Sequence, residues 1–306
     1  MTELVGSDPI TGPGLQQADY PGLHQAACAI SETGQRAHVR FIAAELCLGA
    51  TAALVMDLVH PYPGARVWLG GIAFFALLTV LAVQILRLRG RLTYDQDWYD
   101  GRAVAESIKT LTWRYMMRVQ PFDEDMTADR NFSSKVEEVV GGNLDIRPKL
   151  APSIPEGLEI TPRMRAARNQ SREERRGLYL AARLGDQTHW YLRRSVYNGK
   201  WTRIMLWLSL TSQVLAIGFV IVAMNDPELN LVPLFTTLAA SAVAWSQAKR
   251  FDELRKSYRE AHDQLERIRA QRAMAAQDEP EFIQAVRDSE DAISREHTMW
   301  VAKSMT

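Results

Sequence analysis

Four long apolar runs, placed as two close pairs, constrain the fold of this chain more than any other feature. The first pair covers residues 41–59 and 67–86, and the second covers residues 204–224 and 229–246. An α-helix rises about 1.5 Å per residue, so about 20 residues match a hydrocarbon core about 30 Å thick. Backbone amides in lipid must be satisfied within their own segment. The sequence therefore predicts four membrane-spanning helices joined as two hairpins.

The chain as a whole carries 36 Lys+Arg against 36 Asp+Glu, nearly all of them outside the apolar runs, so its polar part is strongly charged but balanced. This balance argues against bulk binding of nucleic acid. The sequence has no glycine-rich phosphate loop, no paired-histidine motif and no clustered Cys/His spacing. We therefore expect no enzyme, no metal site and no cofactor. The two cysteines, Cys28 and Cys47, are expected to be small apolar fillers.

Basic residues flank the apolar runs on the sides away from the two hairpin tips. The tips carry only Arg66 in the first hairpin, and Asp226 with Glu228 in the second. Positive residues collect on the cytoplasmic side of a membrane. We therefore expect a multi-pass protein of the cell inner (plasma) membrane, with both termini and the central segment in the cytoplasm. The basic flanks are Arg36, Arg40, Arg87, Arg89, Arg91, Arg193, Arg194, Lys200, Arg203, Lys249, Arg250, Arg255 and Lys256.

Composition and helical periodicity divide the chain into five segments. We expect a disordered lead (1–19), a first hairpin module (20–120), a loop or lid (121–163), a second hairpin module (164–275) and a C-terminal helix (276–306).

Within the modules, the absence of proline over residues 87–120 predicts one long helix that ends before Pro121. Residues 164–200 are predicted to form one helix that leads into the third apolar run. Residues 123–161 are predicted to be a loop with at most one short helix. The fold class is therefore an all-α integral membrane protein, with two transmembrane hairpins extended into a cytoplasmic helical bundle or coiled coil.

A heptad-like seam follows the fourth run. Such a seam is too short to establish a self-associating coiled coil. The alternative is that this helix packs on the 164–200 and 87–120 helices of its own chain. The seam consists of Phe251, Leu254, Tyr258, Ala261, Leu265 and Ile268.

Polar side chains inside the first hairpin are candidates for function because such groups are costly in lipid. Folding the hairpin at its tip places Glu45 at the depth of Gln84. A Glu45–Gln84 hydrogen bond and snorkelling of Glu45 to the interface are two structural explanations. The functional alternative is a ring of carboxylates that lines a cation path in an oligomer.

The second hairpin has a polar group close to the expected bilayer midplane. Ser209, Ser212 and Gln213 lie in the third run, and hairpin folding places Gln213 opposite Ser241 and beside Thr237. Hydrogen bonding between the two helices is one interpretation. A pore-facing polar stripe is the other.

Five arginines recur at intervals of three and four. They could bind a nucleotide or a lipid headgroup, both of which are anionic. Alternatively, they form a solvated face that pairs with Glu173, Glu174 or the acidic run at 123–125. These arginines are Arg165, Arg168, Arg172, Arg175 and Arg176.

Aromatic and charged residues in the polar helices resemble a known family signature. The first set is Trp98, Tyr99, Arg102, Glu106, Lys109 and Trp113, and the second set is Gln187, Trp190 and Tyr191. Their surroundings are similar to those of the SLATT superfamily, the SMODS- and SLOG-associating two-transmembrane effector domains. The resemblance covers most of residues 20–275 as two tandem modules, and we expect these side chains to pack between helices.

The resemblance implies a membrane effector of a bacterial conflict or antiviral defence system. Such an effector is thought to form pores after a cytoplasmic, nucleotide-type signal. The expected partners are the lipid bilayer, further copies of the chain, and a nucleotide second messenger or a separate sensor protein. The alternative function is a non-conducting membrane scaffold that presents its cytoplasmic helices to a protein partner.

Overall fold

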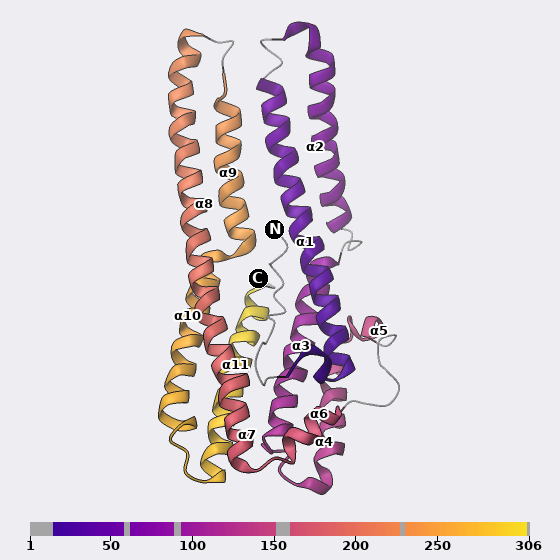
Figure 1. The fold of residues 1–306 in the computed structure, drawn as a ribbon. Coiled ribbons are helices and arrows are strands. Elements are labelled where there is room, and N and C mark those ends of the chain that lie inside the picture. Colours follow the sequence, from indigo (N-terminus) through magenta and orange to yellow (C-terminus); the bar gives the residue numbers. More distant parts are fainter. Residues whose placement is uncertain (1–14, 58–61, 89–92, 151–159, 227–229, 305–306) are drawn as a thin grey trace. The chain divides into compact units, whose positions relative to one another are not determined.

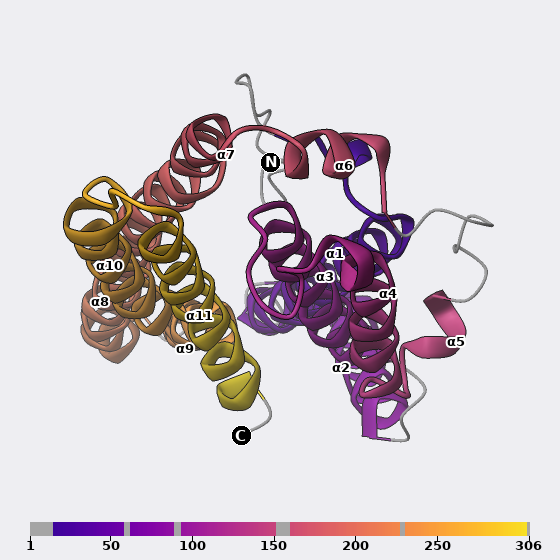
Figure 2. The same ribbon diagram turned by 90° about the horizontal axis from the view of Figure 1, so that it is seen from below.

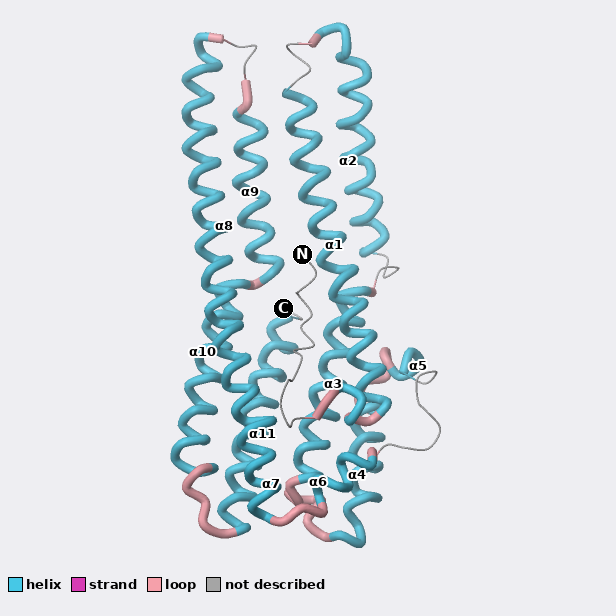
Figure 3. Tube along the Cα trace, viewed as in Figure 1, coloured by secondary structure: helices cyan, strands magenta, loops and turns pink. Residues whose placement is uncertain are grey.

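The computed structural model describes residues 15–57, 62–88, 93–150, 160–226 and 230–304. Helices are the regular elements of these residues, and no strand occurs among them (Figure 3). The chain divides into two compact units. The polar unit comprises residues 1–35, 94–194 and 257–306, and the apolar unit comprises residues 36–93 and 195–256. This all-helical architecture confirms the all-α class predicted from the sequence.

The polar unit is built around α3 (Tyr94–Met116), along which α4 (Asp125–Gly141) and α11 (Glu279–Ser304) pack (Figures 1 and 2). A cluster of aromatic rings fills the space between α3 and α4. The ring centroids of Tyr115 and Phe132 are 5.4 Å apart, and Phe122 lies 6.0 Å from Phe132. Burying aromatic rings of this size supplies a large part of a core's stabilisation.

Helix α4 differs from the predicted loop or lid at 121–163, which allowed at most one short helix. Ala128, Phe132 and Val136 are fully buried at a spacing of four residues, which is the pattern of a helix that packs on one face. The loop prediction rests on Pro148, Pro152, Pro155 and the Gly141–Gly142 pair, all of which lie beyond the buried stripe of α4. Residues 151–159 of the expected lid lie outside the described residues.

The single helix predicted over residues 164–200 is instead interrupted. It consists of α6 (Pro162–Arg168), α7 (Arg172–Tyr179), the π-helical turn η4 (Leu180–Gly185) and the start of α8 (Asp186–Asn225). The break before α7 has a local cause, a capping box at Ser171 and Glu174. The Ser171 Oγ accepts from the Glu174 amide at 3.3 Å, and the Glu174 carboxylate accepts from the Ser171 amide at 2.9 Å.

The long helix predicted over residues 87–120 is also shorter in the structure. Helix α2 (Arg66–Leu88) ends where this stretch begins, and α3 ends at Met116 rather than near Pro121. Residues 89–92, where the two helices would join, lie outside the described residues. A short polar helix, α5 (Arg147–Leu150), follows α4.

The apolar unit contains the two hairpins. The first pairs the carboxyl part of α1 (Gly22–Asp57) with α2 through the buried residues Ala52, Ala73 and Ala76. The second pairs α8 with α9 (Val232–Lys249), where the Phe219 and Phe235 rings stack with centroids 5.3 Å apart. Small side chains permit close approach of helices in lipid, where water supplies no hydrophobic driving force.

Large apolar side chains cover the outer faces of the hairpins. Trp68, Phe75 and Val214 are each more than 60% exposed. An exposed apolar surface of this extent is typical of contact with lipid rather than with water. The protein is therefore a membrane protein.

In the part of the chain that the structure describes, three helical stretches are long and apolar enough to cross a membrane: Gly22–Asp57, Arg66–Arg87 and Arg172–Asn225. They contain the second and third predicted spans and the first as far as Asp57, since residues 58 and 59 lie outside the described residues. Helix α9 covers most of the fourth run but begins at Val232 and includes Gln247 and Lys249, which lower its apolar character. Four spans therefore remain a prediction.

The heptad-like seam lies on α10 (Phe251–Ile268) and packs on α8 of the same chain. The Tyr258 ring lies 5.2 Å from the Trp190 ring. Phe251 stacks on Trp201 with centroids 6.1 Å apart. Of the two interpretations of the seam, the structure therefore shows intrachain packing, against the helix that includes residues 186–200.

Candidate functional site

A buried carboxylate is the centre of the polar unit. Glu290 on α11 accepts hydrogen bonds from Nε and Nη2 of Arg183 at 2.9 and 2.8 Å. It also accepts from the Tyr179 hydroxyl at 3.0 Å and from the Thr110 hydroxyl at 3.1 Å. The side chains of Arg183 and Glu290 are 1% and 0% exposed. One carboxylate thus joins α3, α7, η4 and α11, and we name these four residues the Glu290 cluster.

Burial sets the electrostatics of the Glu290 cluster. Burial alone would lower the pKa of Arg183, but the negative charge of Glu290 outweighs this effect and raises it. Burial also raises the pKa of Tyr179 well above its ordinary value, and the charge of Glu290 adds to the shift. The guanidinium of Arg183 is therefore charged and the phenol of Tyr179 is protonated at neutral pH. A buried ion pair becomes costly when one partner is lost, because the other charge is left uncompensated.

Local structure positions both members of the pair. Arg183 lies in η4, the π-helical turn immediately before α8. π-helical turns are rare and often occur at functional sites. Glu290 lies between Val286 and Ile293 on the buried face of α11. The sequence analysis missed Glu290, although a glutamate inside an apolar helical stripe was a signal that could have revealed it.

A second buried group lies at the start of α1. The Trp113 indole nitrogen donates to the Tyr20 hydroxyl at 3.1 Å, and Tyr20 stacks on His24 with centroids 4.6 Å apart. Burial, reinforced by the positive charge of Lys109, lowers the pKa of His24 to about 4. Burial and the charge of Glu106 raise the pKa of Cys28 to about 12. His24 is thus neutral at physiological pH, and Cys28 is a protonated thiol.

Trp98, a member of the first set of signature residues, lies where α1 contacts α3. The Ser31 hydroxyl donates to the Trp98 carbonyl at 3.0 Å, and Trp98 stacks on Tyr99 with centroids 5.0 Å apart. A Cβ built at Gly101 would lie 2.8 Å from the Ser31 backbone nitrogen, so only glycine permits this helix contact. Arg102 is the next residue along α3 and interacts within the chain.

A similar contact occurs in the second module. The Ser195 hydroxyl donates to the Arg255 carbonyl at 3.0 Å. Trp190 packs edge-on against Tyr191, with centroids 5.1 Å apart. Gln187 is half-buried in the first turn of α8. In each module, a serine before the first apolar run of the hairpin donates to a carbonyl of the helix that follows the hairpin.

The five arginines of the predicted stripe lie on two helices, α6 and α7, and each has a partner within the chain. Arg168 and Arg175 are buried, and they pair with Asp125 at 2.7 Å and Glu279 at 2.6 Å. Arg165 pairs with Asp129 at 2.8 Å. Arg172 pairs with Glu173 at 2.8 Å, and Arg176 donates to the Ala273 carbonyl at 3.2 Å. Anion binding at the stripe remains a prediction that would require these contacts to break.

In the first hairpin, the Gln84 side-chain amide donates to Glu45 at 3.1 Å. Arg87 lies 3.9 Å from the same carboxylate oxygen. The hydrogen bond that hairpin folding predicted is therefore present. The other carboxylate oxygen of Glu45 is buried and has no hydrogen-bond partner among the described residues.

In the second hairpin, the polar residues face different directions. Ser209 and Ser212 are buried, whereas Thr237 and Ser241 are half-buried. Gln213 is exposed, and it donates to Ser209 of its own helix at 3.2 Å. Within the described residues, no hydrogen bond joins Gln213 to Thr237 or Ser241. The expected bond between the two helices is therefore not formed at Gln213.

Among the described residues, a hydrogen bond joins the two hairpins near the end of α1 and the start of α9. Asp57 at the end of α1 accepts from the Leu234 amide of α9 at 3.3 Å. Leu234 lies in the first turn of α9, where backbone amides lack partners within the helix. Asp57 thus caps α9 from the other hairpin.

Among the described residues, no group of three or more His, Cys, Asp or Glu side chains could hold a metal ion. Comparison with known proteins gives two family matches in tandem. Residues 21–176 match the model of SMODS and SLOG-associating 2TM effector domain 3, and residues 179–300 match that of effector domain 1. No curated protein matches the chain, and no solved structure does. The first match covers half of the chain, and the second begins just before η4. The protein therefore belongs to the SLATT superfamily of SMODS- and SLOG-associating two-transmembrane effector domains and contains two of these domains in tandem.

Proposed function

We propose that this protein is a pore-forming membrane effector of a bacterial antiviral defence system, opened by a cytoplasmic, nucleotide-type signal. Its family supports the role of membrane effector in SMODS- and SLOG-associated systems. The basic flanks of the apolar runs support four spans with both termini in the cytoplasm. We propose the inner (plasma) membrane as its location and an assembly of several copies as its active form.

Gln213 is the observation that carries the proposal. It lies near the middle of the apolar part of α8, yet its side chain is exposed. Its amide nitrogen donates to Ser209 of the same helix, but no hydrogen bond to its carbonyl oxygen occurs among the described residues. Such a polar group is costly against lipid and is not costly against water or another polar group. In an assembly, the Gln213 side chains of neighbouring copies can meet at a common axis and line an aqueous path.

The two long helices provide a route from signal to membrane. Helix α1 (Gly22–Asp57) and helix α8 (Asp186–Asn225) each begin among residues of the polar unit and end among residues of the apolar unit. A helix transmits displacement along its axis because its backbone hydrogen bonds are continuous. Arg183 lies just before α8, so a signal that moves α11 and Glu290 would act on the start of α8.

The rival function is a non-conducting scaffold, which the heptad-like seam would favour. The heptad-like seam would suit a protein partner if it were exposed. Its residues Phe251, Tyr258 and Leu265 are buried within the chain.

The test uses the full chain reconstituted in dye-loaded liposomes. We expect dye release after addition of a cyclic-dinucleotide panel, and Gln213→Leu should reduce the release rate at least about tenfold because it removes the polar lining. The matched control is Val214→Leu, an exposed position on the same helix. Equal release from Gln213→Leu and the unaltered chain would contradict the pore-lining role. Absence of release under every condition would favour the scaffold.

A further inference from the structure

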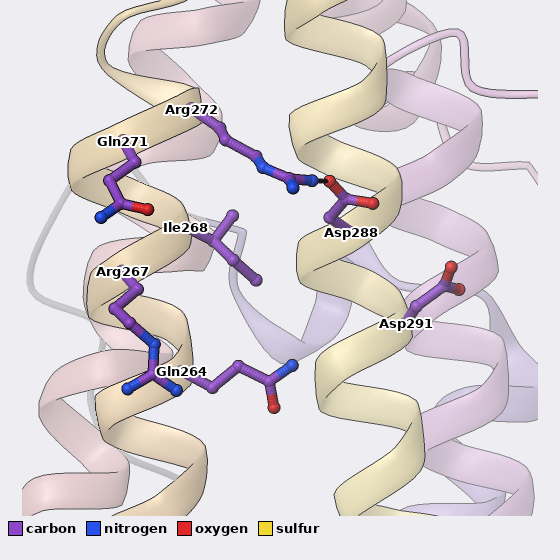
Figure 4. A pocket seen from close by; sticks show the side chains of 7 residues that line it. All are labelled: Gln264, Arg267, Ile268, Gln271, Arg272, Asp288 and Asp291. Carbon is purple, nitrogen blue, oxygen red and sulfur yellow. Dashed lines mark hydrogen bonds and ion pairs between the residues drawn. The ribbon is translucent and has the colours of Figure 1, made fainter.

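A polar groove lies between α10–η5 and α11, outside the Glu290 cluster and the apolar runs. It has a volume of about 400 Å³. In Figure 4, Arg272, Gln264 and Ile268 extend toward α11, whereas Arg267 and Gln271 lie along α10 and η5 at the edge of the groove. The π-helical turn η5 (Arg269–Ala273) continues α10 at this point. The lining residues are Gln264, Arg267, Ile268, Gln271, Arg272, Asp288 and Asp291.

The two carboxylates of the groove are already neutralised by neighbouring arginines. Asp288 pairs with Arg272, as Figure 4 shows. It also accepts from the Gln284 amide at 2.9 Å. Asp291 pairs with Arg114 on α3. The acidic side of the groove is therefore not a site for a cation.

The basic side retains binding capacity. Arg267 is exposed and has no ion pair or hydrogen bond among the described residues. Its guanidinium carries five N–H donors in a planar fork that matches phosphate oxygens. The five arginines of the predicted stripe differ from Arg267, because each of them already has a partner among the described residues.

The size and lining of the groove restrict the ligand further. About 400 Å³ falls within the range of small-molecule sites and exceeds the volume that a free phosphate ion needs. Gln264 and Gln271 offer amide groups to polar atoms, and the half-buried Ile268 offers an apolar surface to a flat ring. We infer that this groove binds a small organic phosphate, with Arg267 on the phosphate and Ile268 beside the organic group.

Binding at this site would affect α11 directly. A phosphate held by Arg267 would also attract Arg272 and compete with Asp288 for it. Asp288 lies two residues before Glu290 on α11. The role of the groove as the receiver of the opening signal rests on the proposed function, whereas binding itself does not.

The test is titration calorimetry on the full chain in detergent, with adenosine 5′-monophosphate, adenosine and inorganic phosphate as separate probes. We expect saturable binding of the monophosphate, weaker binding of phosphate and none of adenosine. Arg267→Gln should weaken monophosphate binding at least about tenfold, and Arg267→Lys should weaken it less because the charge remains. The matched control is Arg259→Gln, which removes an exposed arginine of α10 that does not line the groove.

Several outcomes would overturn the inference. They are no binding of the monophosphate at 10 mM (about the upper limit of weak specific binding), unchanged binding by Arg267→Gln, or equal binding of adenosine and its monophosphate. Dye release from liposomes is measured separately. Binding that depends on Arg267 without release would leave the site intact and count against the pore. Release that does not depend on Arg267 would support the pore and count against the groove as the receiver of the opening signal.

Discussion

Arg183 and Glu290 form a fully buried ion pair, with Nε and Nη2 of the guanidinium 2.9 and 2.8 Å from the two carboxylate oxygens. The pair joins the π-helical turn before α8 to the last helix of the chain. Its neighbours Tyr179 and Thr110 satisfy the remaining acceptor sites of the carboxylate. The stability of the polar unit and the position of α8 therefore depend on the same contact.

Removal of one charge from this pair should be costly. Glu290→Gln leaves Arg183 charged and buried, and we expect it to lower the free energy of unfolding by about 3–5 kcal/mol. The measurement is thermal or denaturant unfolding of the full chain in detergent. The control Asp291→Asn removes a half-exposed partner of Arg114 and should cost less than about 1 kcal/mol.

A double variant tests whether the charge is the cause. Arg183→Met combined with Glu290→Gln removes both charges while leaving an acceptor for Tyr179 and Thr110. We expect the double variant to be more stable than Glu290→Gln alone. If it is less stable than that single variant, packing rather than charge determines the effect.

His24 should make stability depend on pH. Its pKa is lowered from 6.5 to about 4, mainly by burial and then by the charge of Lys109. The unfolded chain therefore binds a proton near pH 6.5 that the folded chain does not bind until about pH 4. The contribution of His24 is complete above about pH 7 and is lost as the pH falls from 6.5 to 4, with about 2 kcal/mol lost between pH 7 and 5.

The measurement is unfolding of the chain at a series of pH values. His24→Phe keeps a ring beside Tyr20 but has no proton to bind, so its stability should vary less between pH 7 and 5. An identical pH profile for the variant and the unaltered chain would show that other groups are responsible.

Gly101 should tolerate no side chain. A Cβ there would lie 2.8 Å from the Ser31 nitrogen and 3.0 Å from the Ala27 carbonyl oxygen, and both are backbone atoms. Gly101→Ala should therefore push α1 and α3 apart and cost about 1–3 kcal/mol in the free energy of unfolding. Gly177→Ala is the matched control, because nothing lies within 4 Å of its Cβ position in α7. Alanine favours helix there by up to about 1 kcal/mol.

Asp57 should control the opening turn of α9. Asp57→Ala removes the acceptor of the Leu234 amide, so hydrogen exchange in residues 232–236 should accelerate. Asparagine caps helices about as well as aspartate, so Asp57→Asn should exchange more slowly than Asp57→Ala. Mass spectrometry of peptides from α9, with peptides from α2 as the reference, measures the difference. Equal exchange in both variants would argue against capping.

Much of this protein is determined by local sequence. The apolar runs specify helices by length alone, because lipid leaves the backbone no other partner. The spacing of Phe251 and Tyr258 in the seam indicates a buried helix face. The capping box at Ser171 marks the start of α7, because its hydrogen bonds join residues only three apart in the chain.

Tertiary structure decided what local pattern could not. Glu290 and Arg183 are 107 residues apart in the chain, and no spacing rule pairs a charge on one helix with a charge on another. The exposure of Gln213 depends on which face of α8 is covered by packing, because Ser209 and Ser212 on the same helix are buried while Gln213 is not. Arg168 has an ion-pair partner because folding brings Asp125 near it, whereas Arg267 has none among the described residues. Charges and polar groups act through space, so their roles are set only when the helices have packed.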